Sequence, residues 1–363
     1  MSNLSALAGT SIEVITGHQQ PSGAYPASPE FSAYRGFCWF RDGSFIADGA
    51  SAAGAAESAD RFFDWCASTL ERHADRIGAV VAQTLDGHPV PDEDMLPTRF
   101  RFDGSIADDD WWDFQLDGFG TWLWAVVEHA RRHGRDLGRW ATAIGLSVDY
   151  LTVSWQRPCF DWWEEHSEQV HVSTLGCIGA GLEAVLGAGV LDGFRTGAAR
   201  LAAAQIRSLV LERGVADGHL TKWFGRTDPD ASLSALVGPM GWLDPADPLA
   251  VGTVRAVRST LAVDGGVHRF ADDVFYGGGR WPLLSCLLGQ GLLATGDRVG
   301  ARAMLDWAAS TATADGLLPE QVAGHLLAPD RRAEWVERWG EVATPLLWSH
   351  GQYLRLWHDL GRP

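Results

Sequence analysis

The sequence predicts an all-α protein, an α/α toroid of about twelve helices in two layers. Apolar residues recur every three to four positions in one segment after another, as they do on one face of a helix. These segments come in pairs joined by short turns, and long irregular loops separate the pairs. No strand-like runs alternate with them, so a parallel sheet is not expected. If the pairs pack side by side, the long loops emerge at one end of the ring and their residues converge there.

In the first half of the chain, the predicted helices alternate with two long irregular segments. Residues 11–42 are rich in Gly, Pro and Ser and lack a helical period, which predicts a loop. Residues 81–113 are also expected to be irregular, with a short hairpin around Asp86-Gly87. The predicted helices are an Ala-rich segment from Ser44, one or two helices over 56–76, a helix ending near His133 and a helix over 136–155.

The second half continues this alternation. The predicted helices are 172–186, 193–211, 248–261, 282–294, 297–313 and a last one that is entered through 344–351 and ends near Leu360. A long irregular segment follows residue 211, and two further loops carry polar clusters. Because no linker or break in composition divides the chain, residues 1–363 are expected to form a single domain, with residues 1–22 as a loosely ordered N-terminal segment.

The composition limits the classes of partner. The 363 residues carry a formal charge of −17, and the pI is near 5.0. Such a chain lacks the basic patch that binds phosphates, which argues against nucleic acid and anionic membranes as partners. A small neutral substrate fits better. The 18 tryptophans are unusual in number, and flat indole faces suit the C–H faces of sugar rings.

The cysteines and the N-terminus indicate the compartment. Five cysteines are scattered along the chain without a C-x-x-C pair, so neither a zinc site nor a disulfide framework is indicated. The N-terminal residues lack the cationic start and continuous apolar core of a signal peptide, and no later run reaches the ~20 apolar residues of a membrane span. We therefore expect a cytoplasmic protein.

The segment Cys159-Phe160-Asp161-Trp162-Trp163-Glu164-Glu165-His166 places two adjacent carboxylates behind two indoles. An apolar run follows, so at least one of the carboxyl groups is expected to meet an apolar wall. Desolvation of this kind raises the pKa of a carboxyl group, which is how proteins make a general acid of Glu. The competing interpretation is an ordinary helix start, where Asp161 is the cap and acidic residues favour the helix dipole.

Four polar clusters fall on the loops that are expected to converge: Arg41-Asp42, Glu164-Glu165, Arg269 with Asp273, and Glu320. Hydrolysis of a bond between two neutral sugars needs two carboxyl groups. One is protonated and donates to the leaving oxygen, and the other is ionised and activates water or attacks carbon. A Glu beside the two indoles would be the acid, and Glu320 would be the base. Each cluster alone is also compatible with a solvated surface residue or, for Arg41-Asp42, with a structural ion pair.

Six segments occur in an order that is typical of one family. They are Trp39-Phe40-Arg41-Asp42, Gln115-Leu116-Asp117-Gly118-Phe119-Gly120, Asp161-Trp162-Trp163-Glu164-Glu165, Arg269-Phe270-x-x-Asp273 with Trp281, Pro319-Glu320-Gln321, and Pro345-Leu346-x-Trp348-Ser349. Together they resemble the signature segments of glucoamylase-like glycoside hydrolases, family 15, over residues 23–354. The resemblance implies an (α/α)6 barrel and an exo-acting, inverting enzyme that releases glucose from a non-reducing end, with no metal or other cofactor.

The resemblance also implies residue roles. Glu164 would be the general acid and Glu320 the general base. Because inversion needs room for water between the carboxyl groups, we expect them to be ~6.5–9.5 Å apart, against ~5–5.5 Å for a retaining pair. The sugar in the cleaved subsite would be held by Arg41 and Asp42, and the neighbouring sugar by Glu165 and Arg269. The predicted substrate-binding residues are Arg41, Asp42, Trp39, Trp163, Glu165, Arg269 and Trp281.

The chain departs from the family pattern in two ways. It is short, with no starch-binding module and nothing before residue 23 that could form a β-rich N-terminal domain, so di- or oligosaccharides are expected as substrates. An α-1,6 disaccharide such as isomaltose is favoured over α-1,4 substrates and trehalose. Members of the family often have a tyrosine shortly before the W-x-R-D segment. Tyr34 is the candidate, but its register is shifted and it is left out of the predicted site.

Three other classes of protein stay open on the sequence alone. The D-D-x-x-D pattern of Asp109, Asp110 and Asp113 is similar to the magnesium-binding segment of terpene cyclases, but it lies in a polar loop without a second metal-binding segment. A non-catalytic carbohydrate-binding protein would keep the tryptophans but lose one catalytic carboxylate, and both are present. A sugar 2-epimerase on a related toroid would use histidines as acid and base. The candidates for that role are His18, His166, His171, His268 and His350.

Overall fold

The computed structural model describes residues 3–107, 111 and 114–362, which are mainly helical. The α-helices are α1 (Asn3–His18), α2 (Phe40–Ala53), α3 (Ala56–Arg72), α4 (Ala74–Leu85), α5 (Asp117–His133), α6 (Ala141–Ser154), α7 (Val172–Ala188), α8 (Gly193–Arg213), α9 (Pro248–Leu261), α10 (Pro282–Ala294), α11 (Arg298–Ser310), α12 (Arg332–Trp339) and α13 (Leu347–Asp359). Short antiparallel strand pairs accompany them: β1 (Phe37–Trp39) with β2 (Arg99–Arg101), β3 (Val215–Ala216) with β4 (His219–Leu220), and β5 (Ala262–Val263) with β6 (Gly266–Val267).

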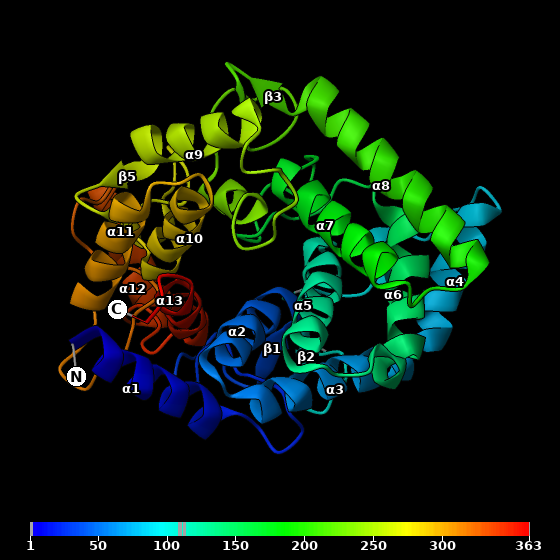
Figure 1. Cartoon of the computed structure of the whole chain (residues 1–363), viewed down its shortest axis with the longest axis horizontal. Coiled ribbons are helices and arrows are strands. Elements are labelled where there is room, and N and C mark those ends of the chain that lie inside the picture. The colour runs from blue at the N-terminus through cyan, green and yellow to red at the C-terminus, as the bar shows by residue number, and fades with distance from the viewer. Residues whose placement is uncertain (1–2, 108–110, 112–113, 363) are drawn as a thin grey trace.

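The helices form two concentric layers (Figure 1). In the inner layer, α13, α2, α5, α7, the 3₁₀ helix Ala231–Leu236 and α10 each contact the next element, and α10 returns to α13. The outer layer consists of α1, α3, α6, α8, α9 and α11, which pack on the inner elements from outside. This is the predicted (α/α)6 toroid.

The inner helices are buried on nearly all sides and therefore lack the polar face of an outer helix. Residues 282–292 of α10, for example, are buried without a break. In two pairs of inner helices, the backbones lie so close together that only glycine fits at the contact. A Cβ atom on Gly49 of α2 would lie 2.0 Å from the backbone oxygen of Gly351 in α13, and one on Gly120 of α5 would lie 2.5 Å from that of Cys177 in α7. These contacts let the ring close tightly.

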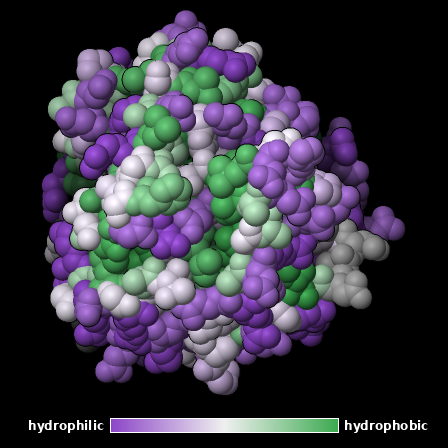
Figure 2. All heavy atoms as spheres, turned by 90° about the vertical axis from the view of Figure 1, so that its right-hand side faces the viewer, coloured by the Kyte–Doolittle hydropathy of each residue, from purple (hydrophilic) through white to green (hydrophobic). Residues whose placement is uncertain are grey.

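The loops before the inner helices meet at one end of the ring. Residues just before or at the start of α2, α7, α10 and α13 line a common cavity there, as the sequence predicts. Figure 2 shows the side of the molecule that lies at the right of Figure 1, where hydrophilic side chains prevail and hydrophobic ones form separate patches. Within the described ranges, no helix is long and apolar enough to cross a membrane.

The structure confirms most of the predicted helices, and α9 and α10 have the expected bounds. The loop predicted over 11–42 is wrong at both of its ends. Its first residues belong to α1, because Leu4, Leu7, Ser11 and Ile15 recur on one buried face, and α1 packs against α13. Its last residues begin α2, which starts before Ser44. The many small residues of α1 hid its helical period.

Two further predictions fail after residue 80. No hairpin forms around Asp86-Gly87, since these residues are the turn that ends α4, and residues 99–101 pair instead with 37–39. The segment after residue 211, expected to be irregular, supplies the short 3₁₀ helix of the inner layer, and α12 was not predicted. Both elements are too short to show several turns of helical periodicity.

Candidate active site

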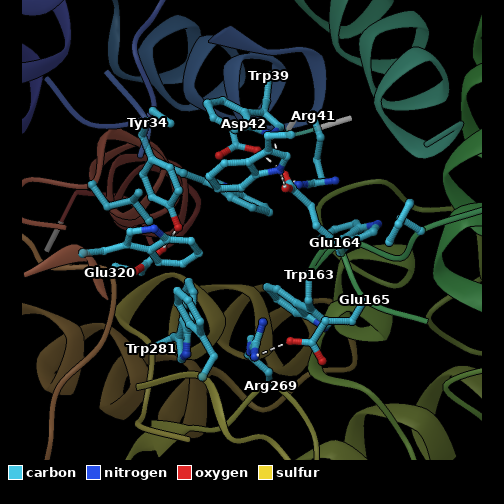
Figure 3. Close-up of a pocket in the computed structure, with 18 of the residues that line it drawn as sticks. Tyr34, Trp39, Arg41, Asp42, Trp163, Glu164, Glu165, Arg269, Trp281 and Glu320 are labelled. Atoms are coloured by element: carbon cyan, nitrogen blue, oxygen red, sulfur yellow. Dashed lines mark hydrogen bonds and ion pairs between the residues drawn. The ribbon is translucent and has the colours of Figure 1, made fainter. Parts of the chain in front are cut away.

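The cavity at the mouth of the ring has a volume of about 560 Å³, within the ~300–1,000 Å³ of small-molecule sites. All nine predicted catalytic and substrate-binding residues line it (Figure 3). They come from five separate stretches of the chain, which the ring brings to one end. The lining residues are Ala27, Tyr34, Trp39, Arg41, Asp42, Trp111, Phe160, Trp162, Trp163, Glu164, Glu165, Arg269, Phe275, Trp281, Glu320, Trp335, Arg338, Trp339, Leu346 and Trp348.

Glu164 occupies a tight turn that the side chain of Asp161 holds. The Oδ1 atom of Asp161 accepts the backbone N–H groups of Trp163 and Glu165, at 2.9 and 3.0 Å. Glu164 has a φ of 61°, in the left-handed region that residues other than glycine seldom adopt. α7 begins only at Val172, so Asp161 caps this turn and not a helix. The helix-start interpretation of this segment therefore does not apply.

The carboxyl group of Glu164 accepts two indole N–H groups. Trp39 Nε1 donates to Oε1 at 2.5 Å, and Trp111 Nε1 donates to Oε2 at 2.7 Å. Trp39 ends β1 directly before α2, and Trp111 stacks on Trp339 of α12 with a centroid distance of 5.6 Å. The two donors come from different parts of the chain and together fix the carboxyl group on the cavity wall.

Glu320 lies on the opposite side of the cavity (Figure 3). It is only 2% exposed, and its Oε1 atom accepts the hydroxyl group of Tyr34 at 2.8 Å. Its Oε2 atom is buried without a hydrogen-bond partner among the described residues. Burial raises the pKa of Glu320 to about 8, while the hydrogen bond from Tyr34 acts in the opposite direction. A buried carboxyl group with a free oxygen and a pKa near neutrality is suited to accept a proton.

Arg41 and Asp42 lie in the first turn of α2. Arg41 Nη1 donates to Gln115 Oε1 at 2.5 Å and to Asp117 Oδ2 at 2.9 Å. Its Nη2 atom is 3.5 Å from Oδ2 of Asp42, which is buried without a hydrogen-bond partner in the described part of the chain. Burial raises the pKa of Asp42 to about 7, although Arg41 lowers it. Oδ2 of Asp42 therefore has the capacity to accept a hydrogen bond from a ligand hydroxyl group in addition to its ion pair with Arg41.

Arg269 connects the residues that are predicted to bind the neighbouring sugar. Its Nη2 atom donates to Glu165 Oε1 at 2.9 Å, and Asp273 accepts two more hydrogen bonds from the guanidinium group, at 2.5 and 2.9 Å. The guanidinium carbon lies 5.3 Å from the ring centroid of Trp163 and 5.6 Å from that of Trp281. Because Arg269 is 2% exposed and its Nε and Nη2 atoms donate to these two carboxylates, it holds Glu165 and the two indoles in a fixed arrangement.

Sequence reasoning missed several residues of the cavity. Tyr34 was set aside because of its register, yet it contacts Glu320. Trp111 falls within the acidic segment that was considered for magnesium. The aromatic residues of α12 escaped notice because that helix was not predicted. The high tryptophan content was the sequence signal for Trp111, Trp335 and Trp339. The missed aromatic residues that line the cavity are Tyr34, Trp111, Phe275, Trp335 and Trp339.

Two of the alternatives depend on a metal ion or on histidine side chains. Among the described residues, no group of three or more His, Cys, Asp or Glu could hold a metal ion. The segment Asp109, Asp110 and Asp113 lies outside those residues. The described lining includes no histidine, which disfavours an epimerase. His350 is instead a buried structural residue: it accepts the backbone N–H of Leu318 at 3.0 Å, and burial lowers its pKa to about 3.

A two-layered helical ring with two carboxyl groups facing each other across an indole-lined cavity has the architecture of a glycoside hydrolase. The model of glycosyl hydrolases family 15 matches residues 2–323, and the chain belongs to this family. It is therefore a glycosidase, and the resemblance seen in the six ordered segments is confirmed.

The chain is similar to particular members of the family. It is 56% identical over 362 residues to the isomaltose glucohydrolase of Kribbella flavida, a match that covers 99% of this chain and 94% of that protein. A solved wild-type glycosidase structure superimposes with a TM-score of 0.97 at 56% identity, covering 99% of this chain and 98% of that one. The glucoamylase from Saccharomycopsis fibuligera shares the fold, with a TM-score of 0.74 at 14% identity and coverage of 99% and 95%.

Proposed function

We propose that this protein is an exo-acting, inverting glucohydrolase that releases glucose from the non-reducing end of small α-glucosides, with isomaltose as its substrate. The observation that carries the proposal is the position of Glu164 and Glu320 on opposite sides of one cavity (Figure 3). Similarity to an isomaltose glucohydrolase over nearly the whole chain supports the choice of substrate. The cavity volume of about 560 Å³ fits a disaccharide better than a polymer.

In the proposed reaction, Glu164 donates a proton to the glycosidic oxygen as the bond between that oxygen and C1 breaks. Glu320 takes a proton from a water molecule, whose oxygen forms the new bond to C1 from the opposite face. The attack inverts the α-configured carbon, so glucose leaves as the β-anomer. This geometry requires carboxyl groups ~6.5–9.5 Å apart, which leaves room for the water.

The remaining polar residues would divide the cavity into two subsites. Arg41 and Asp42 would bind the hydroxyl groups of the glucose that is released, because Oδ2 of Asp42 is buried and accepts no hydrogen bond from the described residues. Glu165 and Arg269 would bind the neighbouring sugar, supported by the indoles of Trp163 and Trp281. Trp39 and Trp111 would keep the acid aimed between the two sugars, and Tyr34 would fix the base.

The test is an incubation with isomaltose, maltose and trehalose in which proton NMR follows the anomer of the first glucose released. We expect the highest kcat/KM for isomaltose and β-glucose as the initial product. Initial release of α-glucose would refute inversion. Faster hydrolysis of maltose or trehalose would refute the substrate assignment while leaving the catalytic pair in place.

We also propose that residues 1–363 act as one catalytic domain in the cytoplasm. In the inner layer, α10 contacts α13 and α13 contacts α2, so helices from the first and last parts of the chain lie side by side in one ring. All five cysteines are buried and free, as is usual in a reducing compartment. Fractionation of the source cells, followed by an activity assay of each fraction, tests the location.

A further inference from the structure

Lys222 is the only lysine in the chain, although Lys and Arg together number 29. It follows β4, directly behind the turn that carries Glu164, and is only 2% exposed. It does not line the cavity. A buried lysine in a chain whose other cations are all arginines calls for a specific physical reason, because burying an ammonium group is unfavourable unless its partners compensate.

The partners of Lys222 surround its ammonium group on three sides. Nζ lies 2.7 Å from Asp161 Oδ2 and 2.6 Å from Asp230 Oδ2, and 3.9 Å from the ring centroid of Phe270. An ammonium group has three rotatable donors on a compact centre, whereas guanidinium is flat and larger. This pocket therefore suits lysine and not arginine. Burial lowers the pKa of Lys222, but the two carboxylates raise it more, so the group is charged.

Both carboxylates that bind Lys222 also support the turn that carries Glu164. Asp161 uses its other oxygen to hold the N–H groups on either side of Glu164. Asp230 Oδ2 also accepts the indole N–H of Trp163 at 2.9 Å, and Asp230 Oδ1 caps the 3₁₀ helix of the inner layer. One ammonium group thus connects the turn, its indole wall and the ring.

The turn needs such support because its backbone is strained. Glu164 and His166 have φ values of 61° and 55°, and neither is a glycine. Residues in this region persist only where the surroundings hold them. If Asp161 were free to rotate, the turn could relax and Glu164 would lose its place between Trp39 and Trp111.

We propose that Lys222 is a positioning residue for the general acid: by fixing Asp161 and Asp230, it keeps the strained turn in the form that presents Glu164 to the glycosidic oxygen. This inference rests on the proposed function, since the role has meaning only if Glu164 is the acid. It assigns no contact between Lys222 and the substrate.

The experiment compares two substrates that differ in their need for the acid. Isomaltose requires a proton on its leaving oxygen. In α-glucosyl fluoride, water attacks C1 with the help of Glu320, the C–F bond breaks, and fluoride leaves as an anion without a proton from Glu164. For Lys222→Met, we expect kcat on isomaltose to fall ~10²-fold or more, the scale of general acid catalysis, while kcat on the fluoride falls only a few-fold.

Two further variants separate positioning from folding. Lys222→Met leaves two buried carboxylates without their cation, whereas Lys222→Met/Asp230→Asn keeps the net charge of the cluster unchanged and is expected to show the same substrate-dependent loss. Arg355→Met is the matched control, because Arg355, whose side chain is only 13% exposed, is a cation that pairs with Asp48 and Asp359 and not with the turn. It is expected to change the rates on both substrates equally.

The outcomes distinguish this inference from the proposed function. Glu164→Gln should lose activity on isomaltose and keep it on the fluoride; if it does not, Glu164 is not the acid and the proposed function fails. If Glu164→Gln behaves as expected but the folded Lys222 variants lose both substrates equally, or neither, Lys222 is not a positioning residue for the acid.

Discussion

Glu320→Gln is expected to make the protein more stable at neutral and alkaline pH while removing its activity. The carboxyl group of Glu320 is buried, and burial raises its pKa from 4.5 to about 8. Ionised Glu320 is therefore disfavoured in the folded protein relative to the unfolded chain. Glutamine has nearly the same shape and can still accept the hydroxyl group of Tyr34, but it carries no charge to be desolvated.

The size of the effect follows from the shift in pKa. A rise from 4.5 to about 8 is a difference of about 3.5 units, and at ~1.36 kcal/mol per unit it corresponds to about 5 kcal/mol. Between these two pH values the folded state binds more protons than the unfolded state, so the stability of the wild type falls as the pH rises. The contribution of Glu320 is fully present below pH 4.5 and is lost by about pH 8.

Urea unfolding of the wild type and Glu320→Gln, followed by tryptophan fluorescence at pH values from 5 to 9, measures this difference. We expect the free energy of unfolding of the variant to exceed that of the wild type by an amount that grows up to about pH 8 and then stays constant. The matched control is Glu337→Gln on α12. Glu337 is exposed, so this variant measures the effect of the same substitution on a carboxyl group that is not buried. A difference between wild type and Glu320→Gln that does not change with pH would refute the desolvation argument.

Three further predictions concern catalysis. Glu164→Gln and Glu320→Gln should each lower kcat on isomaltose by ~10²–10⁴-fold with the fold intact by circular dichroism, and rates near wild type in either would exclude that residue from the catalytic pair. Because the acid must be protonated while the base is ionised, kcat/KM on isomaltose should follow a bell-shaped pH profile; a profile that is flat from pH 4 to 8 would contradict an acid–base pair. Trp39→Phe removes one of the two N–H donors to Glu164 and should lower kcat ~10-fold with little change in KM, since a typical hydrogen bond contributes ~0.5–1.5 kcal/mol; a change confined to KM would show that Trp39 serves binding alone.

The helices and the order of the signature segments could be predicted because both are local. Helical periodicity depends on residues three or four positions apart, so α9 and α10 were found with their bounds. Short elements and elements rich in small residues gave too weak a pattern, which is why α1, α12 and the 3₁₀ helix were missed. The nine site residues could also be predicted without knowing which residues are close in space, because each was identified from the motif of its own segment.

The tertiary structure decided which of these residues touch. Trp39 meets Glu164, Tyr34 meets Glu320 and Lys222 meets Asp161, across separations of 125, 286 and 61 residues. No local pattern encodes such contacts, because they arise only when the ring closes and brings distant loops to one end.

The burial of each carboxyl group was also decided by the tertiary structure. The segment Trp162-Trp163-Glu164-Glu165 suggested a carboxyl group beside an apolar wall, and burial does raise the pKa of Glu165. Burial also raises the pKa of Asp42 to about 7 and that of Glu320 to about 8, in other parts of the cavity. The sequence by itself determined the helical ring, the family and the residue types of the site. Only the folded chain determined how each carboxyl group is held and how far it is desolvated, because desolvation depends on every segment that covers it.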